Sequence, residues 1–367
     1  MLRGIVIGTG WAGEGYATAL RRARVEVVAL CGRSPRPAEA LGERLGITEV
    51  RTDWRSAIDD LSPDIVVVAT SAEPHCEMVE YAAGRGAHVV CEKPLGRTAA
   101  EGGRMLAAVE SAGVKHAYGS TSRYAAGLSR ARALIAEGAI GEVQEVEAVD
   151  HYGMSPLLPY CWVHSLRHGG GLLNNAYPHF LAQSQYVTGG AARWATGHTE
   201  RVVTRVPVGP AVHDFREWEP LDPEQAAAGE WRENDADMAA TAITWLELLD
   251  GRQVPALFRA SAFTGARAVG YLAVYGTAGT LHLEGNPWFH GLQHLTTRDG
   301  QWVDIPIPAV EDPIQAGWDQ LVADLVADVD GAAEVDYPTF RDGFLANQLI
   351  DQVRAATAAV DDSIATP

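Results

Sequence analysis

A glycine-rich stretch at the very start of the chain constrains the fold more than any other feature. The apolar run Gly4-Ile5-Val6-Ile7 leads directly into Gly8-Thr9-Gly10-Trp11-Ala12-Gly13. Glycines in the spacing G-x-G-x-x-G after an apolar run predict a strand, a tight turn and a helix. The first glycine permits the turn, the second lets the backbone approach a ligand, and the third allows the helix to pack closely on the strand.

The N-terminus of such a helix presents backbone N–H groups that lack partners within the helix, and these suit a pyrophosphate. The motif therefore predicts a dinucleotide site. Its predicted contacts are Gly8, Thr9, Gly10, Trp11, Ala12 and Gly13.

Apolar runs alternate with helical stretches through the first third of the chain. The runs are Ile5 to Ile7, Val25 to Leu30, Ile65 to Ala69, His88 to Cys91 and Lys115 to Tyr118. This alternation predicts a doubly wound parallel sheet with helices on both faces, a Rossmann domain over residues 1–122. Ligands of such sheets bind at the carboxyl ends of the strands, so the segments that follow these runs form one rim.

The pattern changes after residue 122. Strand candidates then follow one another without intervening helices, at Val143 to Asp150, Ala239 to Leu248, Val254 to Ala262, Tyr271 to Tyr275 and Thr280 to Leu283. This arrangement predicts an α+β domain over residues 123–367 with a large, mostly antiparallel open sheet. Residues 204–236 are rich in Pro, Glu and Asp, which predicts an irregular excursion at the edge of that sheet.

Composition excludes several classes of protein. A formal charge of -18 argues against nucleic acid as a partner, because phosphate binding needs a basic face. No apolar run approaches the roughly 20 residues of a membrane span, and a strand at the start leaves no room for a signal peptide. A cytoplasmic location is expected.

Cys31, Cys76, Cys91 and Cys161 lack C-x-x-C spacing, which predicts reduced, buried thiols.

The end of the second strand bears on the choice of cofactor. In NAD-binding domains an acidic residue at this position hydrogen-bonds to the ribose 2′-hydroxyl. This chain instead has Gly32-Arg33-Ser34, with Arg36 just beyond. A guanidinium and a hydroxyl suit the 2′-phosphate of NADP. These four residues therefore predict a preference for NADP, with NAD still possible. The alternative is that Arg33 is a solvated loop cation.

Cys91-Glu92-Lys93-Pro94 ends the fourth of these runs. Pro94 stiffens the chain directly after Lys93, so the lysine is expected to point into the crevice. A desolvated lysine near a positive nicotinamide ring has a lowered pKa, which makes it competent as a general base or as a hydrogen-bond donor to a substrate oxygen. The alternative is an ordinary surface lysine.

These motifs together resemble the glucose-fructose oxidoreductase, inositol dehydrogenase and MocA family (Gfo/Idh/MocA). The resemblance runs over nearly the whole chain. Besides the glycine turn it rests on Ala69-Thr70 followed by Pro74-His75, on Cys91 to Leu95, on Gly119 to Arg123, on Gly169-Gly170-Gly171 followed eight residues later by His179, and on Tyr275 to Gly279.

The resemblance implies a site shared by both domains. Lys93 would contact nicotinamide and substrate, and an Asp and a His four residues apart would complete the site. His179 occupies the histidine position, but the aspartate position falls on Asn175, or on Asn174 if the register is off by one. An amide orients a neighbour without adding charge. Thr70, His75 and Glu92 on the same rim complete the predicted cofactor contacts.

Further substrate contacts are predicted around the domain junction. Trp162 and His164 lie in a loop that also holds Arg167 and His168, and such side chains suit a polyhydroxylated ring. His164 and His168 have the i,i+4 spacing of a metal pair, but no third ligand is identifiable, so no metal is predicted. Arg123 and Tyr124 are the remaining candidates, with a structural ion pair as the alternative for Arg123.

The expected function is an NADP-preferring oxidoreductase of a sugar, cyclitol or related polyol, or of the matching ketone. His179 or Lys93 would take the alcohol proton while Asn175 holds a hydroxyl. The family pattern also implies a homodimer or homotetramer through the open sheet. Three alternatives stay open: a site without net redox chemistry, a lyase or glycosidase that retains its cofactor and uses transient oxidation, and a non-catalytic nucleotide-responsive regulator.

Overall fold

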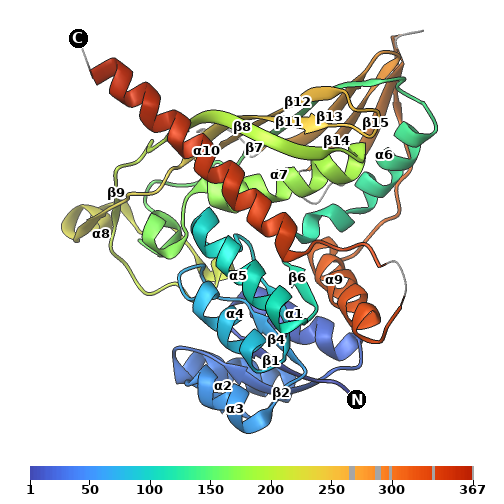
Figure 1. The fold of residues 1–367 in the computed structure, drawn as a ribbon. Coiled ribbons are helices and arrows are strands. Elements are labelled where there is room, and N and C mark those ends of the chain that lie inside the picture. The colour runs from blue at the N-terminus through green and yellow to red at the C-terminus, as the bar shows by residue number, and fades with distance from the viewer. Residues whose placement is uncertain (264–268, 286–290, 297–299, 333–334, 366–367) are drawn as a thin grey trace.

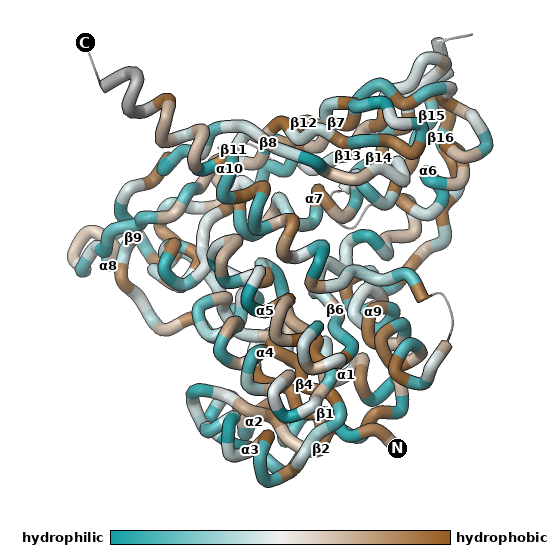
Figure 2. The backbone as a smooth tube through the Cα atoms, in the orientation of Figure 1, coloured by the Kyte–Doolittle hydropathy of each residue, from teal (hydrophilic) through white to brown (hydrophobic). Residues whose placement is uncertain are grey.

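The computed structural model describes residues 1–263, 269–285, 291–296, 300–332 and 335–365. Its strands form two large sheets, which lie at opposite ends of the molecule with helices between them (Figure 1). Apolar residues concentrate where helices meet the first sheet, as the brown segments around β4, α4, α5 and α9 show in Figure 2. No helix in the described ranges has the length and apolar character to cross a membrane.

The first sheet has six parallel strands in the order β3-β2-β1-β4-β5-β6. Their bounds are β1 (Arg3–Ile7), β2 (Glu26–Cys31), β3 (Val50–Arg51), β4 (Ile65–Val68), β5 (His88–Cys91) and β6 (His116–Tyr118). The connecting helices are α1 (Trp11–Arg22), α2 (Pro35–Leu45), α3 (Trp54–Leu61), α4 (His75–Gly84) and α5 (Ala99–Ala112). This confirms the predicted doubly wound sheet. The strand order reverses between β1 and β4, where such sheets form a crevice for a ligand.

The second sheet has eight strands in the order β16-β15-β14-β13-β7-β12-β11-β8. They are β7 (Val143–His151), β8 (Ala191–Glu200), β11 (Ala239–Glu247), β12 (Gln253–Ser261), β13 (Val269–Gly276), β14 (Gly279–Glu284), β15 (Gly291–Thr296) and β16 (Trp302–Asp304). All neighbours are antiparallel except β7 and β12, so the prediction of a mostly antiparallel sheet is confirmed. Sequence analysis did not find β8, β15 or β16.

Three helices pack on one face of this second sheet: α6 (Ala126–Ala136), α7 (Leu172–Thr188) and α10 (Phe340–Ala365) (Figure 1). The helix α9 (Pro313–Val329) instead returns to the first sheet. Its Trp318, Leu321 and Leu325 are buried in one cluster with Tyr16 and Leu20 of α1. The core around the parallel sheet therefore includes a helix from nearly 200 residues beyond the last parallel strand, which sequence analysis assigned to the other domain.

Residues 204–236 are more ordered than predicted. They contain β9 (Arg205–Pro207) paired antiparallel with β10 (Trp231–Glu233), and between these the short turn η4 (Phe215–Glu217) and the helix α8 (Pro223–Ala228). The prediction of a wholly irregular excursion was therefore wrong in part. The two strands form a sheet of their own, apart from the large sheet.

The start of α7 is fixed by Asp237, which precedes β11. The backbone N–H of Leu173 donates to Asp237 Oδ2 at 2.7 Å, and that of Leu172 donates to the Asp237 carbonyl at 2.8 Å. The guanidinium of Arg354 on α10 lies 3.4 Å from Oδ1. Gly171, before the helix, has φ +96 and provides no side chain to cap it. Asp237 therefore supplies the N-terminal cap of α7 from another element.

Replacing Asp237 by Ala is expected to lower the free energy of unfolding by about 2 kcal/mol, because a buried helix N-terminus and Arg354 both lose their acceptor. Asp237→Asn retains an oxygen acceptor and should cost less. Urea denaturation followed by circular dichroism measures both. An Asp237→Ala protein as stable as the parent would show that α7 does not need this cap.

Candidate active site

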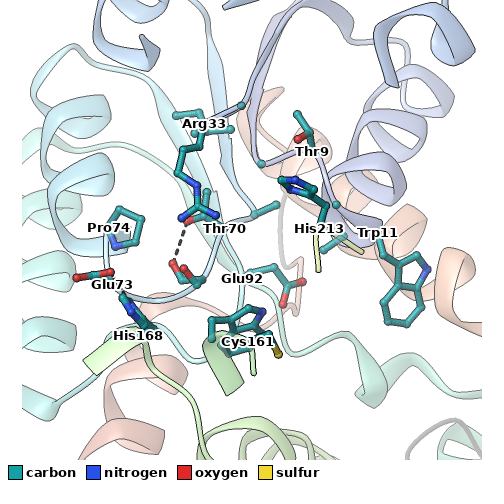
Figure 3. Close-up of a pocket in the computed structure, with 18 of the residues that line it drawn as sticks. Thr9, Trp11, Arg33, Thr70, Glu73, Pro74, Glu92, Cys161, His168 and His213 are labelled. Atoms are coloured by element: carbon teal, nitrogen blue, oxygen red, sulfur yellow. Dashed lines mark hydrogen bonds and ion pairs between the residues drawn. The ribbon is translucent and has the colours of Figure 1, made fainter. Parts of the chain in front are cut away.

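A cleft of about 1070 Å³ opens at the carboxyl ends of the parallel strands and is lined by residues of both halves of the chain. Arg33, Thr70 and Glu92 reach it from the first sheet, while Cys161, His168 and His213 reach it from the second half (Figure 3). The cleft therefore lies where the strand order predicts a ligand.

The glycine turn forms one wall of the cleft. Gly8 has φ +122, and a Cβ there would lie 2.2 Å from the carbonyl oxygen of Ala69. A Cβ at Gly13 would lie 2.0 Å from the carbonyl oxygen of Gly8, so this glycine serves packing and does not line the cleft. Gly10 caps α1 without a side-chain hydrogen bond, which leaves N–H groups of the first turn for a ligand. These features fit a bound pyrophosphate.

The five other residues predicted from the motif, Gly8, Thr9, Gly10, Trp11 and Ala12, all line the cleft. Gly32, Arg33 and Ser34 line it beyond the end of β2, together with Thr52 and Trp54. Arg36 does not line the cleft, because α2 begins at Pro35 and carries Arg36 onto its exposed side. The side chain of Arg33 is exposed and lies in the cleft wall.

His75 was predicted to contact the cofactor, but the structure buries it completely. Its Nδ1 lies 3.1 Å from the carbonyl oxygens of Pro94 and Leu95, and its Nε2 lies 3.0 Å from that of Thr70. Burial lowers the pKa of His75. The ring therefore ties the loop after β4 to the loop after β5, which carries Lys93, and it does not line the cleft. Thr70 does line it.

Lys93 lies in the cleft wall and contacts the second domain. Its Nζ lies 3.3 Å from Oδ1 of Asn175 and 3.4 Å from the carbonyl oxygen of the same residue. Burial lowers the pKa of Lys93, and the charge of neighbouring Glu92 opposes this effect. A lysine with a lowered pKa holds a larger neutral fraction near pH 7, which is what a general base requires.

Glu92 also lines the cleft, and only 9% of the residue is exposed. The hydroxyl of Tyr16 donates to Oε1 at 2.9 Å, and the backbone N–H of Lys93 donates to Oε2 at 3.0 Å. Burial raises the pKa of Glu92, while the Lys93 charge lowers it. The Trp318 side chain is a further hydrogen-bond partner, so the carboxyl group is held by donors from three residues.

Asn175 and His179 come from the first half of α7 and line the same cleft. The amide Nδ2 of Asn175 donates to the Gly171 carbonyl at 2.8 Å, so its Oδ1 is turned toward Lys93. Nδ1 of His179 lies 3.1 Å from the hydroxyl oxygen of Ser122. Burial and the charge of Lys93 hold the pKa of His179 well below its ordinary value, so the ring is neutral at pH 7.

Asn174, the other possible match to the aspartate position, faces away from the cleft. It is 1% exposed, and its Nδ2 donates to the carbonyl of Gly170 at 2.9 Å. The structure therefore brings Lys93, Asn175 and His179 together. No group of three or more His, Cys, Asp or Glu residues with metal-ligand geometry exists in the described part of the chain.

Three residues predicted to contact substrate lie outside the cleft lining. Arg123 forms an ion pair with Asp336 at 2.7 Å and stacks over the ring of Tyr186, which is the structural alternative considered above. The Tyr124 hydroxyl donates to Asp324 Oδ2 at 2.8 Å. Both belong to the turn η1 (Thr121–Tyr124), which directs them toward α9 and α7.

His164 is the third of these residues. It is 2% exposed, and its Nδ1 accepts the backbone N–H of Cys161 at 3.2 Å. Burial lowers its pKa to about 4. The short turn η2 (Trp162–His164) places Trp162 in the cleft wall and turns His164 inward against the ring of Trp218.

Sequence analysis missed several residues of the cleft wall. His168 was named with the predicted loop, and it pairs with Glu73 of the opposite rim. Tyr160 and Cys161 lie in the same loop and were missed. Their position next to Trp162 was the available signal. Trp318 and residues 211–213 gave no signal, because they come from segments far away in sequence and carry no motif.

Comparison with known families places both halves of the chain in one group. Residues 2–120 match a model described as oxidoreductase family, NAD-binding Rossmann fold, and residues 128–282 match the GFO/IDH/MocA C-terminal domain.

Curated relatives include a levoglucosan dehydrogenase of Pseudarthrobacter phenanthrenivorans, 31% identical over 42% of this chain and 41% of the relative. The D-glucoside 3-dehydrogenase of Escherichia coli is 27% identical over 60% of this chain and 62% of the relative. An inositol 2-dehydrogenase of Rhizobium meliloti is 28% identical over 50% and 54%. The chain thus spans about two fifths to three fifths of the length of these relatives.

Solved structures match the whole fold. An NAD binding oxidoreductase from Klebsiella pneumoniae superposes with a TM-score of 0.78 at 26% identity, covering 98% of this chain and 97% of that one. A levoglucosan dehydrogenase in complex with NADH and levoglucosan gives a TM-score of 0.80 at 22% identity, with the same coverage. The second match concerns the fold alone.

The Lys93–Asn175 contact predicts a measurable effect of Asn175→Asp. A carboxylate beside the ammonium stabilises its charged form, so the pKa of Lys93 should rise. The chain contains only two lysines, Lys93 and Lys115. Reductive ¹³C-methylation followed by NMR titration can therefore follow Lys93 directly.

Lys115, which pairs with Asp328 at 2.6 Å on the surface, provides the internal reference signal in both proteins. In the parent protein the Lys93 signal should titrate below the ordinary lysine value. A Lys93 titration that Asn175→Asp leaves unchanged would contradict the contact.

Proposed function

Because the chain belongs to the Gfo/Idh/MocA oxidoreductase family, whose N-terminal module is an NAD-binding Rossmann fold, we propose that it is a dehydrogenase acting on a CH–OH group of a sugar, cyclitol or related polyol, with NADP as the preferred cofactor. The observation that carries this proposal is the convergence of Lys93, Asn175 and His179 in the cleft that the glycine turn forms.

The cofactor proposal rests on two parts of the cleft wall, the first turn of α1 and the end of β2. The uncapped first turn of α1 suits the pyrophosphate. Arg33 and Ser34 stand at the end of β2, where an acidic residue would favour NAD, and they offer a guanidinium and a hydroxyl to a 2′-phosphate. When bound, the nicotinamide dinucleotide supplies the hydride acceptor.

Proton transfer is assigned to Lys93 and His179. Both have lowered pKa values, which raises the fraction of each nitrogen that is unprotonated and able to accept the proton of a substrate hydroxyl. Asn175 holds the lysine through Oδ1 and adds no negative charge. The absence of a carboxylate here keeps the pKa of Lys93 lower than an aspartate would, which favours its neutral form at neutral pH.

The substrate class is inferred from the cleft wall and from the relatives. Tyr160, Trp162 and His168 offer aromatic surfaces and hydrogen-bonding groups of the kind that bind a polyhydroxylated ring. The names of the curated relatives, which are dehydrogenases of levoglucosan, of a D-glucoside and of inositol, support the same class.

Self-association through the outer face of the large sheet is a further part of the proposal. Trp194 on β8 stacks with Trp245 on β11 at 5.7 Å between ring centroids, and Trp194 and Ile243 are 42% and 37% exposed. Apolar side chains exposed together on a sheet face favour burial against a second surface. A homodimer or homotetramer of this chain would provide it.

The function is tested by following absorbance at 340 nm with NADP and NAD against pyranoses, inositols and their keto forms, in both directions. Lys93→Met should lower kcat/KM for the active substrate by a factor of about 100 or more, since general-base catalysis contributes on this scale. Lys115→Met, which removes the other lysine, is the matched control and should retain activity. Full activity in Lys93→Met would exclude the assigned role.

Cofactor preference is tested by titrating each dinucleotide into the protein. Arg33→Ala should weaken NADP binding by about tenfold, because a charge-assisted hydrogen bond to the 2′-phosphate is lost. Its affinity for NAD should stay the same. Arg36→Ala is the control, because Arg36 lies outside the cleft lining. Tighter binding of NAD than of NADP by the parent protein would overturn the proposed preference.

A further inference from the structure

A segment of the second half of the chain crosses the glycine turn. Between β9 and β10, residues 211–216 leave the two-stranded ribbon, and Ala211, Val212 and His213 line the cleft. The carbonyl oxygen of His213 lies 3.0 Å from the position that a Cβ would take at Gly10. We call residues 211–216 the strap. It lies against the same turn whose N–H groups suit a pyrophosphate.

The strap is attached to the helix that begins at this turn. Nη2 of Arg216 lies 2.6 Å from Oε2 of Glu14, in the first turn of α1, and 2.6 Å from Oδ2 of Asp214 in the strap itself. Arg44 on α2 approaches the same Glu14 oxygen at 3.2 Å. One arginine therefore bridges the strap and α1. Because Arg216 is 51% exposed, this bridge can contribute little to global stability.

The His213 side chain is among those that surround the cavity in Figure 3. Near it are Thr9 and the first turn of α1, whose positive end attracts an anion. The His213 imidazole lies beside Thr9 in Figure 3, so the second half of the chain brings a side-chain N–H group to this turn. A histidine here would thus contact the charged middle of a dinucleotide.

We propose that the strap closes over the pyrophosphate of the bound dinucleotide and that the His213 imidazole donates a hydrogen bond to a phosphate oxygen. The inference rests on the proposed function, because it takes the dinucleotide as the ligand. The second domain then contributes directly to cofactor binding. Release of the dinucleotide then requires the strap to move away and the Arg216 bridge to break.

The first test measures equilibrium binding of NADPH by quenching of tryptophan fluorescence, for which Trp11, Trp54 and Trp318 in the cleft wall are suited. His213→Ala should raise Kd about tenfold, the effect of losing one hydrogen bond to a charged group. His213→Gln, which keeps a donor, should lose less. His198→Ala removes a histidine of β8 outside the cleft lining and should bind as the parent does.

Ligand truncation identifies the group that His213 contacts. Adenosine 2′-monophosphate lacks the pyrophosphate, so His213→Ala should bind it with the affinity of the parent protein. An equal loss for this ligand and for NADPH would show that His213 acts on the adenosine end or on the fold, and would overturn the proposed contact.

The second test is kinetic. Arg216→Ala should increase the NADPH dissociation rate several-fold in stopped-flow displacement, while urea denaturation stays near that of the parent. An unchanged dissociation rate would overturn the role of the strap in release. If the parent protein binds neither NADPH nor NADH, the proposed function fails together with this inference. If it binds them and His213→Ala and Arg216→Ala behave as the parent, only this inference fails.

Discussion

The contact between the Lys93 ammonium and the Asn175 amide joins the two domains at the point where chemistry is proposed. Lys93 follows a strand of the parallel sheet, and Asn175 lies in the first turns of α7, the helix packed under the large sheet. The geometry of the Lys93–Asn175 contact depends on one residue in each domain. His75 ties the lysine loop to the neighbouring rim loop, and Asp237 holds the start of α7 from the sheet. Without either support, the two groups would be positioned independently.

The electrostatics of this contact differ from what a carboxylate at position 175 would create. With an amide there, burial determines the pKa of Lys93, and Glu92 is the neighbouring charge that opposes it. Burial raises the pKa of Glu92 and so partly suppresses its charge, while the hydrogen bond from Tyr16 favours the charged form. His179 remains neutral beside them. The result is a site with two nitrogen bases and little negative charge, which suits the removal of a hydroxyl proton near neutral pH.

The cleft is also built jointly by segments that are far apart in sequence. Trp318 of α9 packs edge-to-face on Trp11 at 5.3 Å and contacts α1 at Gly15, while the strap reaches the other side of the same helix start through Arg216. The dinucleotide half of the site therefore depends on the second half of the chain. This is a physical reason to treat the two domains as one cofactor-binding unit.

The sequence by itself determined the features that depend on local backbone chemistry. A glycine at position 8 permits the positive φ of the turn. Apolar runs that alternate with helical stretches predict a parallel sheet, and a lysine directly after a strand and before Pro94 is expected to face the rim. Each of these predictions follows from residues that are neighbours in the sequence. From these came the doubly wound fold and the candidates Lys93, Asn175 and His179.

The tertiary structure decided which of the remaining polar side chains face the cleft. Arg36, His75, Arg123, Tyr124 and His164 carry suitable chemical groups but are turned toward solvent or neighbouring elements. His213 and Trp318 enter the cleft without any local motif. The direction of a side chain on a short turn is set by the packing of segments that are far away in the sequence, and no sequence periodicity indicates that packing.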